Sequence, residues 1–85
     1  MELNSDDFRR HLSKMLAAAQ RLRFHAVEVK AGDLHRCLGG YPGSGHRMPV
    51  CCSVLRQAMK SGDTVVAAPA SGQGASLVIR FRLPR

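Results

Sequence analysis

Five residues in the middle of the chain have side chains that bind metals or act as nucleophiles: His35, Cys37, His46, Cys51 and Cys52. Thiolate and imidazole are zinc donors, but structural zinc sites usually contain paired ligands two to four residues apart. One residue separates His35 from Cys37, and Cys51 adjoins Cys52, so neither pair has that spacing. Cys37 and Cys51 also fall at apolar positions of predicted helices, where a free cysteine behaves as a small hydrophobic residue. The sequence therefore favours core packing over a metal site, with Cys52 expected to be partly exposed.

The glycine-rich segment 40–47, GYPGSGHR, has the spacing of a nucleotide phosphate-binding loop. In that motif glycine amides and a lysine hold the phosphates, and a serine or threonine binds magnesium. Here His46 stands at the lysine position and Arg47 at the hydroxyl position, and a chain of 85 residues leaves no room for the parallel sheet. These departures argue against a nucleotidase. Two interpretations remain: the backbone amides beside His46 and Arg47 contact a DNA phosphate, or the loop only reverses the chain.

No pattern in the sequence favours catalysis. We find no pair of carboxylates placed on one element for general acid–base work. Six acidic residues, five of them within residues 1–33, are few for a metal-dependent nuclease. A catalytic Cys–His pair is a spatial relation that the sequence does not establish. We therefore expect a protein without catalytic residues, metal ion or cofactor.

The positive charge is concentrated in the C-terminal part of the chain. The formal net charge is +7, and residues 34–85 carry seven lysines and arginines against Asp63 alone. Residues 1–33 carry six basic and five acidic residues. A local excess of positive charge attracts phosphate groups, so this asymmetry suggests a polyanionic partner. The alternative is a solvated surface that surplus arginine keeps soluble.

The first secondary-structure element predicted from the sequence is a helix near the N-terminus. Ser5 is its expected N-cap, and Asp6 and Asp7 lie in the first turn, where the helix dipole favours carboxylates. Residues at helical spacing should face the core: Phe8, Leu12, Met15, Leu16, Ala19 and Leu22. Alternation in residues 24–30 then predicts a short strand.

A second, two-turn helix is predicted at residues 33–38, with Leu34, Cys37 and Leu38 directed inward. Four glycines and a proline predict a loop at residues 39–46. Pro49 suits the first turn of a third helix that extends to about Lys60. The apolar face of that helix is predicted to contain Cys51, Val54, Leu55 and Ala58.

Two strands complete the predicted fold, at residues 64–68 and 76–83, joined by a loop around residues 69–74. The last strand has the clearest pattern, because apolar residues alternate with polar, small or basic ones. Its predicted buried residues are Leu77, Ile79, Phe81 and Leu83. Arg80 and Arg82 should lie on the opposite, solvent-facing side.

The predicted order of helix, strand, helix, helix, strand and strand covers the whole chain and resembles the winged helix-turn-helix superfamily. The resemblance implies an α+β fold with residues 1–85 as a single domain, in which three helices pack on a three-stranded antiparallel sheet. The chain departs from the family in one respect. A long glycine-rich loop replaces the usual turn of three or four residues between the second and third helices.

The resemblance implies a DNA-binding protein whose third helix enters the major groove and whose hairpin contacts the DNA backbone. Arginine can pair with guanine and glutamine with adenine, while lysine and serine contact phosphates or base edges. No lysine or arginine lies between Thr64 and Ile79, so the hairpin loop itself brings no cation to a groove. The residues carried over by position are Arg47, Ser53, Arg56, Gln57, Lys60, Ser71, Gln73, Arg80 and Arg82.

Two other functions fit the same fold, because fold alone does not determine function. Winged helices also serve as docking or dimerisation modules, in which the long first helix would pair across a two-fold axis, and as accessory subunits of nucleic-acid enzymes. The apolar runs are too short for a membrane span, and the acidic N-terminus is unlike a secretory signal. Three cysteines do not form a secreted disulfide framework. We therefore expect a cytoplasmic protein. Its expected partner is a nucleic acid, with DNA favoured over RNA, and the alternatives are a second copy of the chain or a larger protein.

Overall fold

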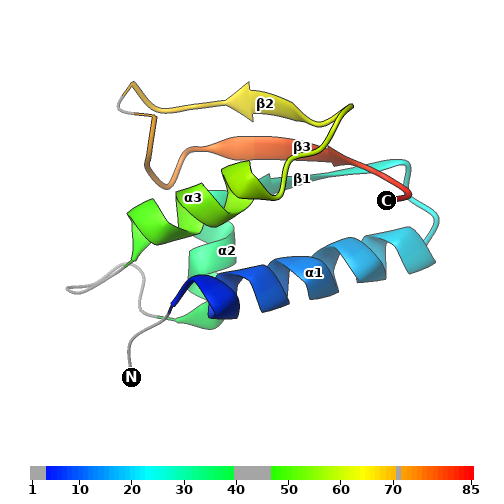
Figure 1. Cartoon of the computed structure of the whole chain (residues 1–85), viewed down its shortest axis with the longest axis horizontal. Helices are drawn as coiled ribbons and strands as arrows, with labels where there is room; N and C mark the ends of the chain where they lie inside the picture. Colours follow the sequence, from blue (N-terminus) through cyan, green and yellow to red (C-terminus); the bar gives the residue numbers. More distant parts are fainter. Residues whose placement is uncertain (1–3, 40–46, 71) are drawn as a thin grey trace.

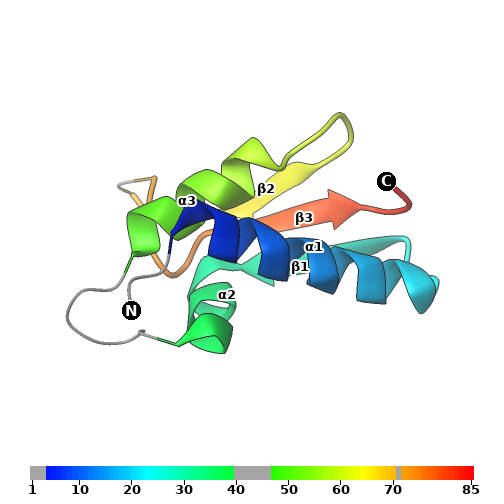
Figure 2. The same cartoon turned by 60° about the horizontal axis from the view of Figure 1, so that its bottom comes forward.

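The computed structural model of the protein describes residues 4–39, 47–70 and 72–85. The three strands form one antiparallel sheet in which the last strand lies between the other two. Figures 1 and 2 show the helices on one side of this sheet, with its other face left open. The expected α+β class is therefore confirmed. The elements follow in the order α1 (Ser5–Arg21), β1 (Ala26–Lys30), α2 (Ala31–Leu38), α3 (Met48–Gln57), β2 (Thr64–Ala67) and β3 (Val78–Arg82).

The core lies between the helices and the inner face of the sheet. Ile79 in the central strand β3 is opposite Val29 of β1 and Val65 of β2, so apolar residues cross the whole inner face. Phe8 and Leu12 of α1 are buried against this face together with residues of α2 and α3. The alternation of the last strand is confirmed, because all four residues predicted to be inward are buried: Leu77, Ile79, Phe81 and Leu83.

The N-cap of α1 is Asn4 rather than Ser5, so that prediction is wrong. The Asn4 side chain accepts a hydrogen bond from the Asp7 N–H at 3.0 Å, and the Asp7 carboxylate accepts from the Asn4 N–H at 2.9 Å. This reciprocal pair is a capping box, which satisfies two amides at once. Ser5 is instead the first helical residue, and its hydroxyl accepts from Arg9.

The far end of α1 also differs from the prediction. Leu22, expected in the core, is 71 % exposed, because the helix stops at Arg21 and the chain reverses through Arg23 with a φ of 66°. Phe24 lies in this connection, 57 % exposed, and not in β1, which begins at Ala26. The end of α1 thus leaves two large apolar side chains at the surface.

The inward face of α2 is rotated relative to the prediction. The helix starts directly after β1, and its first two amides donate to the segment before β3: Ala31 to Leu77 at 2.8 Å and Gly32 to Ala75 at 3.0 Å. Residues three and four positions after Ala31 therefore face the core, and these are Leu34 and His35. Cys37 consequently lies on the exposed side, in contrast to the prediction.

Candidate nucleic-acid interface

The polar residues of α3 that were expected to face DNA contact other parts of the domain. Arg56 Nη2 donates to the Gly72 carbonyl at 2.8 Å, which ties α3 to the β2–β3 connection. Gln57 Oε1 accepts from Arg9 of α1 at 3.3 Å. Lys60 is not in the helix, because α3 ends at Gln57 and Lys60 lies in the turn before β2. Ser53 is half-buried, and Gln73 is exposed in the β2–β3 connection.

Arg47 lies at the other end of α3, where its backbone is held by a buried histidine. The Arg47 N–H donates to His35 Nε2 at 2.8 Å, so the proton of the neutral ring is assigned to Nδ1, which donates to the Gly39 carbonyl at 3.1 Å. The ring is 1 % exposed and packs edge-on against Phe8 at 5.1 Å. His35 therefore joins the two ends of the segment that contains residues 40–46.

The described residues among the candidate metal ligands, His35, Cys37, Cys51 and Cys52, do not form a metal site. Among residues 4–39, 47–70 and 72–85, no group of three or more histidine, cysteine or acidic side chains is placed to hold a metal ion. His46 and the rest of 40–46 lie outside the described residues, as does Ser71. The roles suggested for these residues stay predictions.

The two adjacent cysteines are both buried, so the expected exposure of Cys52 is wrong. The Cys51 thiol lies 3.5 Å from the Ala31 carbonyl, and Cys52 Sγ accepts from the Gly74 N–H at 3.3 Å. Burial, with a smaller contribution from the neighbouring Cys52, raises the pKa of Cys51 to about 12. A thiol that stays protonated is a poor nucleophile, so Cys51 has a packing role.

Thiol labelling should distinguish the three cysteines. We expect dithionitrobenzoate to modify Cys37 alone in the native protein, since Cys37 is exposed and the other two are buried. All three should react after unfolding in urea. The release of thionitrobenzoate, followed by absorbance, measures the number of reactive thiols in the native protein and in the unfolded protein. The Cys37→Ser variant should show no rapid native reaction, and a second rapidly reacting thiol would contradict the buried placement.

The open face of the sheet carries the arginines of β3. Arg80 is opposite Glu28 of β1 and Thr64 of β2, and Arg82 is opposite Ala26. Two hollows adjoin here, and Arg82 lines both. One hollow also contains His25, Thr64 and Arg80, and the other contains Lys60 and Ser61. Lys60, Arg80 and Arg82 therefore form one continuous area, which we call the basic surface.

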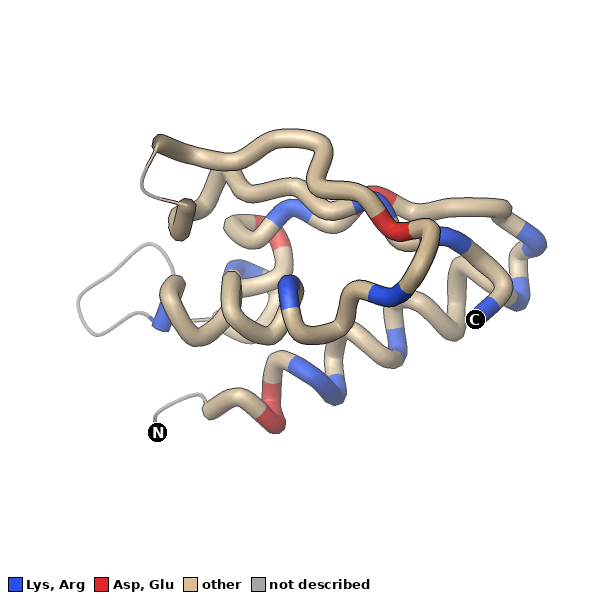
Figure 3. The backbone as a smooth tube through the Cα atoms, turned by 45° about the horizontal axis from the view of Figure 1, so that its top comes forward, with Lys and Arg blue, Asp and Glu red and all other residues tan. Residues whose placement is uncertain are grey.

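Figure 3 shows basic residues both on the helices and on the sheet. Their positions alone therefore do not indicate which of them could bind an anion, whereas their ion pairs do. Among the described residues, four arginines pair with aspartates: Arg9 with Asp6, Arg10 with Asp7, Arg36 with Asp33 and Arg85 with Asp63. Within the described part of the chain, the side chains of the basic surface make no ion pair. Their charge is therefore available to an external anion.

Asp63, which the sequence analysis did not single out, organises the turn beside the basic surface. Its carboxylate accepts from the backbone N–H groups of Lys60 and Arg82, both at 2.7 Å, and is fully buried. Arg85 Nη1 reaches both carboxylate oxygens, at 2.8 and 3.0 Å, and Nη2 donates to the Ala58 carbonyl. Burial by itself would raise the pKa of Asp63, but the hydrogen bonds from Arg82, Lys60 and Arg85 outweigh it and lower the pKa.

The positions of Lys60 and Arg82 thus depend on one carboxylate. The turn also requires a glycine at position 62. Its φ of 95° is one that glycine adopts readily, and the Cβ of any other residue would lie 3.0 Å from Arg82 Cδ. A sequence signal for this arrangement exists: Asp63 is the only acidic residue among residues 34–85.

Comparison of the chain with protein-family models, with curated proteins and with solved structures finds no match. For residues 4–39, 47–70 and 72–85, none of the helices combines the length and apolar character needed to span a bilayer.

Proposed function

We propose that the protein is a non-catalytic DNA-binding domain and that Lys60, Arg80 and Arg82 of the basic surface contact the phosphate backbone. The observation that carries this proposal is the pair of adjoining hollows that share Arg82. Of the four lysines and arginines that line them, Arg85 is paired with Asp63, and Lys60, Arg80 and Arg82 make no ion pair among the described residues. Lysine and arginine contacts to phosphate supply the sequence-independent part of nucleic-acid affinity.

We assign the fold to the winged-helix superfamily as part of the same proposal. The element order and the sheet order β1-β3-β2 support this assignment. In it the β2–β3 connection corresponds to the wing. The long segment between α2 and α3 stays a departure from the family pattern.

Base recognition by α3 has less support than backbone contact by the basic surface. Arg56 and Gln57 are engaged within the domain, with Gly72 and Arg9 respectively. Arg47 directly precedes α3 and Lys60 lies three residues after its last residue, Gln57, so the ten residues of the helix, about 15 Å long, lie between them. We therefore assign the main contacts to the sheet face and the turn before β2.

The salt dependence of binding tests the basic surface. With about three phosphate contacts, the logarithm of the association constant should fall against the logarithm of salt concentration with a slope of about −2 to −3. Labelled duplex and single-stranded DNA, titrated by fluorescence anisotropy in several KCl concentrations, give this slope. Arg82→Gln should weaken binding and make the slope less steep by about 1.

A matched control is Lys14→Gln on α1, which removes an exposed cation from the helix layer. This variant should keep both the affinity and the slope of the wild type. Undetectable binding at low salt, binding that does not depend on salt, or equal losses in Arg82→Gln and Lys14→Gln would each overturn the proposal.

A dimerisation module is the second candidate, and the exposure of Leu22 and Phe24 is the observation that favours it. These residues lie at the end of α1, while the rest of its apolar face packs within the domain. Sedimentation equilibrium of the protein alone tests this candidate. A concentration-dependent dimer supports it, and a monomer at high concentration contradicts it.

A further inference from the structure

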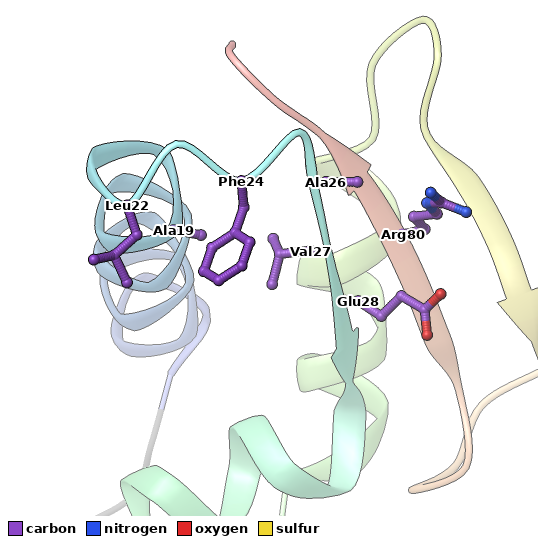
Figure 4. A pocket seen from close by; sticks show the side chains of 7 residues that line it. All are labelled: Ala19, Leu22, Phe24, Ala26, Val27, Glu28 and Arg80. Carbon is purple, nitrogen blue, oxygen red and sulfur yellow. The ribbon is translucent and has the colours of Figure 1, made fainter.

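An apolar groove adjoins the basic surface at the edge of the sheet. Its apolar walls are Ala19 of α1, Leu22 and Phe24 of the connection that follows, and Val27 of β1, and its volume is about 590 Å³. Figure 4 shows the Phe24 ring between α1 and β1, with Val27 directed toward it. Glu28 and Arg80, which also line the groove, extend on the other side of β1. The groove therefore bends around the free edge of the sheet.

Arg80 connects this groove to the basic surface, because it lines both the groove and the hollow that contains Arg82. A ligand that occupies the two together needs a flat apolar part for Phe24 and a negative part for Arg80 and Arg82. A nucleotide has both parts. Phe24 is 57 % exposed, so its ring is accessible for stacking.

We propose that the groove accepts an unpaired base of single-stranded nucleic acid whose phosphates contact the basic surface. This inference rests on the proposed function and names its ligand more closely. Bases in a duplex are paired and stacked inside the helix, so they cannot enter a groove between α1 and β1. Single strands offer their bases to exposed aromatic side chains and their phosphates to nearby cations.

Glu28 adds a preference among bases. Its side chain lines the groove, and its carboxylate repels phosphate but accepts a hydrogen bond from an exocyclic amino group. Cytosine carries such a group at N4, whereas thymine presents a carbonyl oxygen at the same position. We therefore expect oligo-dC to bind more tightly than oligo-dT of equal length and charge.

The experiment compares oligo-dC, oligo-dT and a mixed-sequence duplex of about 12 nucleotides, within the usual range of single-strand site sizes. By fluorescence anisotropy, the single strands should bind more tightly than the duplex. Phe24→Ala should weaken single-strand binding about tenfold or more, because it removes the stacking surface. The salt slope should not change, since no cation is lost.

Two variants complete the test. Val66→Ala is the matched control, because Val66 is a half-exposed apolar residue on β2, at the opposite edge of the sheet, and its truncation should leave binding unchanged. Glu28→Ala should abolish the preference for oligo-dC over oligo-dT. Circular dichroism of each variant confirms that the fold is retained.

The outcomes separate the two proposals. If neither single strands nor duplex bind at low salt, the proposed function itself fails. If the duplex binds as tightly as the single strands and Phe24→Ala changes nothing, the groove is not a base site, although the basic surface keeps its assigned role. A dimer that dissociates in the Phe24→Ala variant would assign the groove to a second copy of the chain and overturn this inference.

Discussion

Replacing Asp63 with asparagine should lower the free energy of unfolding by about 3 kcal/mol, because it removes one partner from a buried ion pair. The Asp63 side chain has no exposed surface and joins three segments: the turn after α3, the strand β3 and the C-terminal Arg85. An amide offers one acceptor oxygen in place of two, so it cannot accept all of these hydrogen bonds. The Arg85 side chain, only 12 % exposed, would lose the carboxylate that pairs with its guanidinium. Urea denaturation followed by circular dichroism measures the change.

The matched control is Asp33→Asn, which removes a carboxylate from the exposed Arg36 pair and should change stability by less than about 1 kcal/mol. Equal effects of the two substitutions would contradict the role assigned to Asp63. Asp63→Asn should also lower the affinity for DNA, since the backbone of Lys60 and Arg82 is held by this carboxylate.

The pH dependence of stability gives an independent test of Asp63. Its pKa in the folded protein is lowered, so the ionised form stabilises the fold above the unfolded pKa of about 3.9. This contribution is lost as the pH falls through the folded pKa. The wild type should therefore lose stability more steeply below about pH 4 than Asp63→Asn, which has no proton to bind at this site.

Replacing His35 with phenylalanine should lower the free energy of unfolding by about 2–4 kcal/mol. The substitution keeps an aromatic ring beside Phe8 but removes both ring nitrogens. The Arg47 N–H and the Gly39 carbonyl then lose the partners that they have in the wild type. Urea denaturation measures the loss, and hydrogen exchange should show a less protected Arg47 amide.

The control for this substitution is His25→Phe, because His25 is exposed at the start of β1. It should leave stability within about 0.5 kcal/mol of the wild type. An unchanged stability in His35→Phe, together with unchanged protection of the Arg47 amide, would refute the view that this ring joins the ends of the glycine-rich segment.

Periodicity correctly predicted the interior of most elements. In β3 the period of two places Ile79 and Phe81 in the core, because each residue of a strand points to the face opposite its neighbour. In α3 the helical spacing places Val54 and Leu55 in the core. The buried faces of β3 and α3 could be predicted because the period of a strand or helix is a property of residues that are neighbours in the sequence.

The errors lie at the ends of elements, where contacts between distant segments decide the outcome. The start of α2 depends on hydrogen bonds to Ala75 and Leu77, which rotate the helix and bury His35 in place of Cys37. The end of α1 depends on a reversal at Arg23 that leaves Leu22 exposed. No local pattern in the sequence contains this information.

The candidate site was predicted only in part. The sequence placed Arg80 and Arg82 on one face of the last strand, and the structure agrees. The addition of Lys60 to that surface required the turn that Asp63 holds. Arg56 is hydrogen-bonded to Gly72, 16 positions away in the sequence, and Gln57 is hydrogen-bonded to Arg9, 48 positions away.

The sequence by itself determined the element order, the buried faces of α3 and β3 and most of that of α1, and the excess of positive charge in residues 34–85. Only the tertiary structure decided which of those charges remain available. A cation is neutralised or engaged when an acceptor lies within a few ångströms of it in space, and separation along the chain does not set that distance. Asp63 is the sole acidic residue among residues 34–85, and the fold pairs it with Arg85 and leaves Arg80 and Arg82 at the open face.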